Sequence, residues 1–430
     1  MSDYRVLNFP SIDEQIICAK HKSGLQVRLI PKKLSSGCAV FGTRYGGKDN
    51  CFKLSGEKEF TEMPAGVAHY LEHKMFENED GEDTFAKFAK YGTYANAYTS
   101  SNVTCYHFTS TTHFLDNLRI LLDFVSHPYY TKENVEKEQG IIGQEIRMGD
   151  DNPGRALYYM LLNSLYENNP VKTNVVGTVE SIARITPELL YKCYNTFYNL
   201  SNMRLCVSAD ITMDEVLGVC DEILSVQPEN EIIRKPFEEK DEVNVKYSEK
   251  EMSVSKPIFI VGIKDNKILS DGNERMKRSM VSDILTTILF GPSSDFSNEV
   301  YESGLVNDFG YGNNSADTYS FCEINGESDE PEKAYEKFLN CIKNAKSIIK
   351  PEDFKRCKNS TIASYIKACD GVGIAQAEFN TAIFGTEVFD ILDLVKNVTF
   401  DDVIELSEEL FDEKFISLNV VKPINGENKK

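Results

Sequence analysis

The sequence predicts an α+β protein of two homologous domains, each a mostly antiparallel sheet with helices packed on one face. Two observations carry this prediction. Short β-rich runs occur in neighbouring pairs and are interspersed with longer runs of helical periodicity. In addition, two segments of the first half recur in the second half at nearly one offset.

The repeat is seen in two pairs of matching segments. Residues 67–76 align with residues 281–290 at an offset of 214 residues, and residues 185–189 align with residues 398–402 at an offset of 213. In both copies of the second pair a threonine is placed to cap a helix that leads into a β-rich run. Because the offsets agree to within one residue, the halves are predicted to be diverged copies of one domain.

Local patterns predict the remaining elements. β-rich or alternating runs predict strands, the first two as a hairpin, at residues 25–30, 39–45, 103–108, 203–208, 258–263, 319–324 and 416–421. Helical spacing of apolar residues, an acidic run after a turn, or an opening proline predicts helices at residues 114–125, 134–148, 331–346 and 351–367.

A change of composition separates the two halves. Residues 227–256 hold Pro228, Pro236 and a charge-rich run at 238–242, which predicts an inter-domain linker. The first domain is then residues 1–226 and the second is residues 257–430.

Composition and charge exclude several classes of protein. A net charge of −20 argues against nucleic-acid binding, which needs a basic face. No apolar run approaches the ~18–20 residues of a membrane helix, and the first residues lack the pattern of a secretory signal. Eleven cysteines without a CxxC pair indicate reduced thiols, so a cytoplasmic protein is expected.

Residues 69–73 form an HxxEH motif, a signature of zinc peptidases. Apolar neighbours predict a helix there, and positions four apart on a helix lie about 5–6 Å from each other on one face. The imidazoles of His69 and His73 are therefore placed to bind one Zn²⁺ ion per chain. Glu72 faces the same cleft without being needed as a ligand, which suits a general base acting on water activated by the metal.

The third ligand is expected from elsewhere, and the helix predicted at residues 134–148 offers candidates. Glu138 and Glu145 share one face of it but lie ~10.5 Å apart along the axis, so both cannot easily reach one ion directly. Spacing alone leaves open which of them binds. The other histidines have no paired spacing and are expected to be structural or surface residues: His21, His107, His113 and His127.

The second half cannot build a histidine site of this kind, because all six histidines precede residue 128. At the repeat positions of the motif it carries Asp283, Thr286 and Thr287. One copy is therefore expected to do chemistry, and the other to enclose substrate or to pack.

With these motifs the chain resembles the inverzincin peptidases, among them pitrilysin, insulin-degrading enzyme and the mitochondrial processing peptidase. The matching stretches are residues 66–76, 95–100 and 138–147, and the resemblance is closest to a bacterial branch of half-length, two-domain zinc peptidases. It implies that Glu145 is the third zinc ligand. It also implies that Glu138 is a supporting residue, of the kind that orients ligands and tunes the metal.

The same resemblance implies where substrate binds. A peptide is expected to add as a strand to a sheet edge at Asn96 and Ala97, with Tyr98 and Thr99 following. The family also closes four such domains as a clamshell around a chamber. A chain with two domains is then expected to form a dimer.

One departure from the family lies in the second half. Active members usually place an Arg and, seven residues later, a Tyr there to hold substrate, whereas this chain has Val300 and Asn307. A related partner chain is therefore expected to supply the clamp in a heterodimer. A homodimer, in which Tyr311 substitutes, is the alternative.

The sequence thus predicts a zinc-dependent endopeptidase that hydrolyses unfolded peptides, with a catalytic first domain and a non-catalytic second domain that closes the chamber. Two alternatives stay open. One is a non-catalytic or partner-dependent zinc-binding subunit of a heterodimeric peptidase, and the other is a zinc hydrolase of small amides. The intact Glu72 favours catalysis, because a scaffold subunit has no need of a general base.

Overall fold

The chain folds into two compact units, seen in a computed structural model that describes residues 4–424. Unit 1 comprises residues 4–146, 173–236 and 366–389. Unit 2 comprises residues 147–172, 237–365 and 390–424. Within the described residues no helix is both long and apolar enough to cross a membrane.

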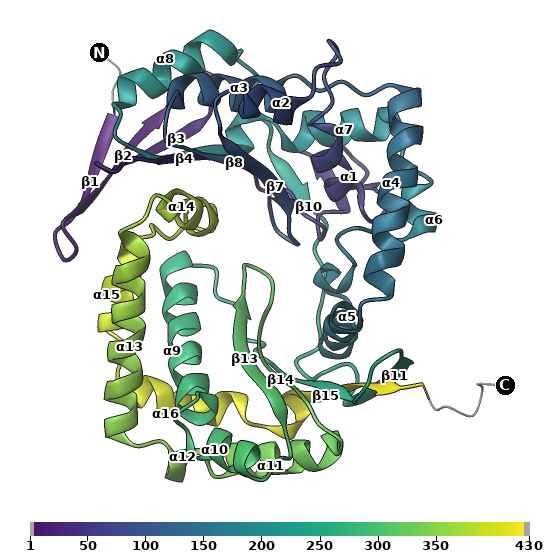
Figure 1. The fold of residues 1–430 in the computed structure, drawn as a ribbon, viewed down its shortest axis with the longest axis vertical. Coiled ribbons are helices and arrows are strands. Elements are labelled where there is room, and N and C mark those ends of the chain that lie inside the picture. The colour runs from purple at the N-terminus through teal and green to yellow at the C-terminus, as the bar shows by residue number, and fades with distance from the viewer. Residues whose placement is uncertain (1–3, 425–430) are drawn as a thin grey trace. The chain divides into compact units, whose positions relative to one another are not determined.

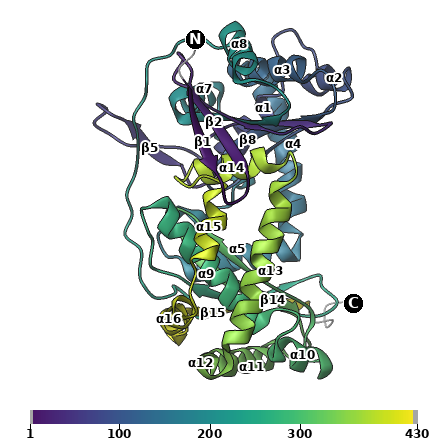
Figure 2. The same ribbon diagram turned by 90° about the vertical axis from the view of Figure 1, so that its left-hand side faces the viewer.

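Unit 1 is built on a seven-stranded sheet in the order β1-β2-β3-β9-β4-β8-β7. Its neighbours are antiparallel except for β3 and β9. The strands are β1 (Tyr4–Phe9), β2 (Glu14–Lys20), β3 (Gln26–Pro31), β4 (Gly37–Thr43), β7 (Tyr94–Thr99), β8 (Thr104–Ser110) and β9 (Met203–Ala209). A three-stranded sheet stands apart from it (Figure 2), made of β10 (Ile232–Arg234), β5 (Cys51–Leu54) and β6 (Thr61–Glu62).

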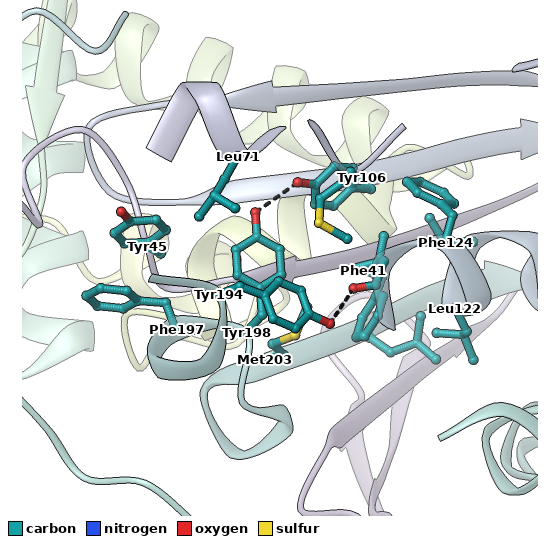
Figure 3. Close-up of a cluster of buried hydrophobic side chains, with 14 of the residues drawn as sticks. Phe41, Tyr45, Leu71, Tyr106, Leu122, Phe124, Tyr194, Phe197, Tyr198 and Met203 are labelled. Atoms are coloured by element: carbon teal, nitrogen blue, oxygen red, sulfur yellow. Dashed lines mark hydrogen bonds between the residues drawn. The ribbon is translucent and has the colours of Figure 1, made fainter. Parts of the chain in front are cut away.

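Helices cover one face of the large sheet, and α14 lies on the other face (Figure 1). The helices of this unit are α1 (Val67–Lys74), α2 (Thr84–Ala89), α3 (Phe114–Ser126), α4 (Lys132–Asp150), α6 (Val179–Ile182), α7 (Pro187–Phe197), α8 (Met213–Ile223) and α14 (Ile374–Ala382). Between α1, α7 and the sheet lies a buried aromatic core (Figure 3), in which the hydroxyls of Tyr106 and Tyr198 are 2.8 Å apart. This core fixes α1, which carries the HxxEH motif, against β7 and β8.

Unit 2 is built on a five-stranded sheet in the order β11-β15-β12-β14-β13. Its strands are β11 (Tyr247–Met252), β12 (Ile258–Lys264), β13 (Asn307–Ser315), β14 (Ser320–Glu327) and β15 (Ile416–Pro423). Its helices are α5 (Pro153–Leu165), α9 (Gly272–Phe290), α10 (Asp295–Glu302), α11 (Pro331–Lys343), α12 (Ala345–Ile348), α13 (Pro351–Cys369), α15 (Asp390–Lys396) and α16 (Phe400–Leu410). Leucines of α5 pack on β12 and β15 in one apolar cluster, while α9, α11 and α16 contribute to a second.

The two sheets share one topology, which confirms the predicted α+β class and the internal repeat. The series β3-β9-β4-β8-β7 and β11-β15-β12-β14-β13 have the same order, and in each series only the first pair is parallel. The predicted caps repeat as well, since Thr186 accepts from the Leu189 N–H and Thr399 accepts from the Asp402 N–H. In each copy the capped helix is followed by the second strand of the series, which is β9 after Thr186 and β15 after Thr399.

The predicted hairpin of residues 25–30 and 39–45 is wrong. Both runs are strands, β3 and β4, but β9 lies between them, parallel to β3 and antiparallel to β4. The long helix predicted at residues 331–346 is also divided, because α11 ends at Lys343 and α12 begins at Ala345.

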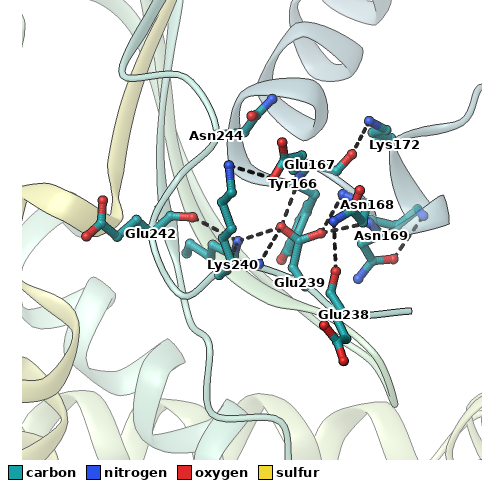
Figure 4. A network of polar contacts seen from close by, with 12 residues as sticks. Tyr166, Glu167, Asn168, Asn169, Lys172, Glu238, Glu239, Lys240, Glu242 and Asn244 are labelled. Carbon is teal, nitrogen blue, oxygen red and sulfur yellow. Dashed lines mark hydrogen bonds and ion pairs between the residues drawn. The ribbon is translucent and has the colours of Figure 1, made fainter. Parts of the chain in front are cut away.

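Residues 227–256, the predicted linker, contain two strands, and the linker assignment stays a prediction. Within this segment β10 pairs with β5, and β11 pairs with β15. Between the two strands, the Glu239 carboxylate accepts from three consecutive backbone N–H groups, of Glu167, Asn168 and Asn169 (Figure 4). The buried Lys264 ammonium lies 3.2 Å from the same carboxylate.

The compact units do not follow the halves of the chain. Residues 147–172 of the first half pack within unit 2, and residues 366–389 of the second half pack within unit 1. The domain boundaries at residues 226 and 257 describe the repeated halves and stay a prediction. All eleven cysteines are unpaired thiols, and only Cys18 and Cys51 are not buried.

Candidate metal centre

Two helices of unit 1 bring three metal-binding side chains together. On α1 the rings of His69 and His73 face each other with centroids 4.6 Å apart. From α4, the Glu145 carboxylate oxygens lie 3.5 Å from His69 Nε2 and 3.6 Å from His73 Nε2. One donor atom from each residue lies within 4.8 Å of the other two, and across residues 4–424 this is the one group with such geometry.

Helix α1 is placed by its ends and by its buried face. It begins after Gly66, whose φ of +93° favours glycine and where a Cβ would lie 2.6 Å from a backbone oxygen. Tyr70 donates a hydrogen bond to the Val135 carbonyl, and the fully buried Lys74 donates to the Asn134 carbonyl at 3.2 Å. These bonds tie α1 to the start of α4, so the two helices present their ligands at a fixed spacing.

Glu138 contacts the far nitrogen of one of these imidazoles. Its Oε1 lies 3.0 Å from His73 Nδ1, and the carboxylate is buried. Donation from Nδ1 to Glu138 leaves Nε2 as the nitrogen that carries the lone pair toward Glu145. Burial lowers the pKa of His73, but the hydrogen bond and charge of Glu138 outweigh it, so the pKa is raised.

Glu72 lies next to this group without belonging to it. Its Oε2 accepts from the Thr99 hydroxyl at 2.6 Å. Burial raises the pKa of Glu72, and the hydrogen bond from Thr99 opposes that rise. A carboxylate with a raised pKa is better matched to accepting a proton near neutral pH.

Strand β7 forms the outer edge of the large sheet. Ser100 donates its N–H to the Val103 carbonyl of the neighbouring chain segment at 2.8 Å. Because inward and outward residues alternate along an antiparallel strand, the amides of Thr99 and Ala97 point away from β8. The predicted substrate-binding residues therefore lie on a strand with one unpaired side.

Side chains already contact this edge. Asn96 Oδ1 accepts from the Ala97 N–H at 2.9 Å. On the other face of the strand the Tyr98 hydroxyl accepts from Gln376 and donates to Asn380, both on α14 and both at 2.9 Å. Of the four residues Thr99 contacts Glu72, and the role of all four in binding substrate stays a prediction.

The repeat positions in unit 2 carry no comparable donor set. Thr286 donates to its own helix at the Ser282 carbonyl, and the Tyr311 hydroxyl lies 3.4 Å from the Thr287 hydroxyl. Burial raises the pKa of Asp283 to about 7. Uncharged hydroxyls and a carboxyl of that pKa are poor ligands for zinc at neutral pH.

The two positions at which an Arg and a Tyr are expected to hold substrate lie in unit 2. Val300 on α10 is 1% exposed and packs in the core of this unit. Asn307 begins β13 and is exposed. Neither side chain can replace the charge of an Arg or the ring of a Tyr.

The remaining histidines contact groups outside the metal-binding cluster. His21 bonds to Ser23 and Asp221, His113 to Asp116, and His127 to Asp123. Burial lowers the pKa of His107.

Sequence reasoning did not foresee that Thr99 would bond to Glu72. Alternation along β7 indicates that Thr99 and Tyr98 face opposite sides, but the position of α1 over that strand end is a tertiary contact.

Two imidazoles and a carboxylate beside a further glutamate, on this repeated α+β fold, form the kind of donor set that metallopeptidases use. Residues 56–179 match the family described as Insulinase (Peptidase family M16), and residues 184–361 match the Peptidase M16 inactive domain. The chain is 35% identical over 409 residues to a Bacillus subtilis protein named "Uncharacterized zinc protease YmfH", covering 94% of this chain and 95% of the relative. The chain therefore belongs to peptidase family M16.

Solved structures agree with this assignment. A structure from Alicyclobacillus acidocaldarius, described as an M16-like peptidase, is 30% identical, has a TM-score of 0.90, and covers 98% of this chain and 99% of that chain. Pitrilysin is 15% identical with a TM-score of 0.72, and the match covers 100% of this chain but 48% of pitrilysin. At that identity the similarity to pitrilysin shows a shared fold.

Proposed function

We propose that this protein is a zinc-dependent endopeptidase that hydrolyses unfolded peptides. The observation that carries the proposal is the convergence of His69, His73 and Glu145, with Glu72 beside them and engaged by Thr99. Names of relatives that contain the words zinc protease support the same reading.

The donor set fits zinc. Zinc in catalytic sites is held by three protein ligands of the nitrogen and carboxylate type, with a fourth position open. A bound zinc ion supplies Lewis acidity, which polarises the peptide carbonyl and makes water a better nucleophile. One ion per chain is expected, because unit 2 offers no second donor set among its described residues.

The chain's own residues divide the remaining work. His69, His73 and Glu145 hold the ion, and Glu138 fixes the His73 ring in the tautomer that binds it. Glu72 takes a proton from the attacking water and later gives it to the leaving amine nitrogen. Burial of Glu72, which raises its pKa, favours this exchange near neutral pH.

Substrate is proposed to add as a strand to the edge of β7 at Asn96, Ala97, Tyr98 and Thr99. The outward amides of this strand supply main-chain hydrogen bonds that any extended peptide can satisfy. A site of this kind selects unfolded peptides, because a folded strand has its own main-chain groups already paired.

The test combines metal analysis with peptide cleavage. The purified chain should contain zinc and cleave an unstructured peptide, and a chelator should stop cleavage. Glu72→Gln should keep the zinc and lower kcat about 10²–10⁴-fold. Glu79→Gln, an exposed carboxylate just beyond α1, is the matched control and should retain activity. Unchanged cleavage in the Glu72→Gln protein with zinc bound would show that the general-base assignment is wrong.

A second candidate is a subunit that needs a partner for activity. It is favoured by the buried Val300 and by Asn307, which leave this chain without the expected clamp. A related chain in a heterodimer would then supply it, whereas Tyr311 is the nearest substitute in a homodimer. Robust cleavage by the purified chain alone excludes the partner requirement, and the mass of the active species in solution distinguishes a dimer from a monomer.

The third reading, a zinc hydrolase of small amides, is tested with substrates of different length. Strand addition needs several consecutive residues, so a long unstructured peptide should have a kcat/KM at least about 10²-fold above that of a dipeptide amide. Equal values would favour the small-amide reading. A reducing, cytoplasmic location is proposed from the eleven unpaired thiols.

A further inference from the structure

The hydroxyl of one residue on the edge strand holds Glu72. Thr99 Oγ1 donates to Glu72 Oε2 at 2.6 Å. Thr99 is the last residue of β7, and α1, which carries Glu72, packs against that strand. The strand that is expected to bind substrate therefore also donates a hydrogen bond to the expected general base.

The amide of Thr99 is not used by the neighbouring strand. Ser100 pairs inward with Val103, so the preceding amide of Thr99 points outward, away from β8. The hydroxyl of Thr99 therefore holds Glu72 while its main chain lies on the side that a peptide would approach.

The proton of the Thr99 hydroxyl is directed to Glu72 by the groups behind it. Thr104 Oγ1 lies 3.2 Å from Thr99 Oγ1 and donates to the Tyr45 carbonyl at 2.9 Å. Since a threonine hydroxyl has one proton, Thr104 has none left to give to Thr99. Thr99 therefore keeps its own proton for the Glu72 carboxylate.

We propose that Thr99 is a positioning residue for Glu72, and this inference rests on the proposed peptidase function. A glutamate side chain turns about three bonds, and a hydroxyl held on a strand of the sheet orients its carboxylate before substrate arrives. Groups that are already oriented need no rearrangement during proton transfer. The side chain of Thr99 thus orients the Glu72 carboxylate, and the neighbouring residues of β7 are proposed to bind the peptide.

The test compares two substitutions of Thr99 with one control substitution of another threonine on the paired strand. Thr99→Val keeps the β-branch and the amide but loses the hydroxyl, and should lower kcat about 10-fold or more with KM and zinc content unchanged. Thr99→Ser restores the hydroxyl and should recover kcat to within about threefold. Thr109→Val, on β8 at the opposite end of the strand pair, should leave kcat unchanged.

Two kinetic results would overturn the proposal. One is a Thr99→Val protein with kcat within about threefold of the original, and the other is a rise in KM with kcat unchanged, which would assign the hydroxyl to uniform substrate binding. Melting temperatures of all variants are compared first. If Thr99→Val does not fold, Thr99→Ala is used in its place with the same expectation.

A crystallographic comparison keeps this inference separate from the proposed function. In Thr99→Val the Glu72 carboxylate should leave its position or become disordered, and in Thr99→Ser it should stay. A Glu72 carboxylate that is unmoved and ordered in Thr99→Val contradicts the positioning role, whatever the activity. If the original protein binds zinc but cleaves no peptide, the proposed function fails, while these structures still decide what holds Glu72.

Discussion

His73 Nδ1 lies 3.0 Å from Glu138 Oε1, and this bond determines which nitrogen of the ring faces Glu145. Glu138 and Glu145 lie seven residues apart on α4, so one helix supplies both a direct contact to the site and the support of a ligand on another helix. Glu138 and Glu145 both belong to α4. They lie close to the histidines of α1 because the hydrogen bond from Tyr70 to the Val135 carbonyl joins the two helices.

Removing the charge of Glu138 is expected to weaken zinc binding without abolishing it. Glu138→Gln should raise the zinc dissociation constant about 10–100-fold, because the His73 ring loses its charged acceptor and part of its basicity. Titration with a competing chelator measures this. Glu136→Gln, an exposed carboxylate on the same helix, is the control, and an equal loss in both proteins would point to a general effect of charge.

Breaking the ion pair beneath α14 should destabilise unit 1. Arg28 Nη1 lies 2.5 Å from Oε1 of the fully buried Glu378 and also contacts Glu387. Burial raises the pKa of Glu378 to about 8, so above that pH Arg28→Met leaves a buried carboxylate uncompensated and should cost about 3–5 kcal/mol in the free energy of unfolding. Urea unfolding measures the loss. The double variant Arg28→Met/Glu378→Met should recover most of it, and a single variant costing under about 1 kcal/mol would contradict the assignment.

Asp283 should make the stability of unit 2 depend on pH. Burial raises its pKa to about 7, against about 4 in an unfolded chain. The folded state therefore binds the proton more tightly, so the contribution is complete below about pH 4 and is lost as the pH rises through about 7. Asp283→Asn should remove this loss and be more stable than the original protein at pH 8 by about 1–3 kcal/mol.

Unfolding at pH 5 and pH 8 checks this prediction. The exposed Asp241→Asn in the same unit is the control and should show the pH dependence of the original protein. If Asp283→Asn is instead less stable than the original protein at pH 8, the charged Asp283 carboxylate stabilises the fold and the prediction is wrong.

Glu239 should anchor the segment that follows β10. Its carboxylate accepts from three backbone N–H groups and offsets the buried charge of Lys264. Glu239→Ala should cost about 2–4 kcal/mol and speed proteolytic cleavage within residues 238–246, because buried donors lose their acceptor. Limited proteolysis with mass spectrometry measures this effect. The neighbouring Glu238→Gln should be cut at the original rate.

Much of the candidate site could be predicted because it is local. His69, Glu72 and His73 belong to one turn of one helix, and helical geometry alone places both imidazoles on one face. Glu145 could not be selected by spacing, because the choice between it and Glu138 depends on how α4 lies against α1. The resemblance to a family proposed Glu145, and the structure places it beside both imidazoles.

The fold shows the same division between local and distant effects. Repeated offsets and cap residues predicted two copies of one domain, since these signals lie within short segments. The hairpin prediction was wrong because β9, which is distant in the sequence, lies between β3 and β4 in the sheet. Composition predicted a linker at residues 227–256, but it could not predict the strand pairing and the Glu239 contacts within that segment, which depend on distant partners.

The contact between Asn96 and the Ala97 amide has a consequence for the chain before it meets substrate. An unpaired strand edge invites pairing with other molecules and so promotes aggregation. Asn96 covers one outward amide of β7, that of Ala97. If a peptide adds to this edge as proposed, it has to displace the Asn96 side chain before its main chain can pair with Ala97.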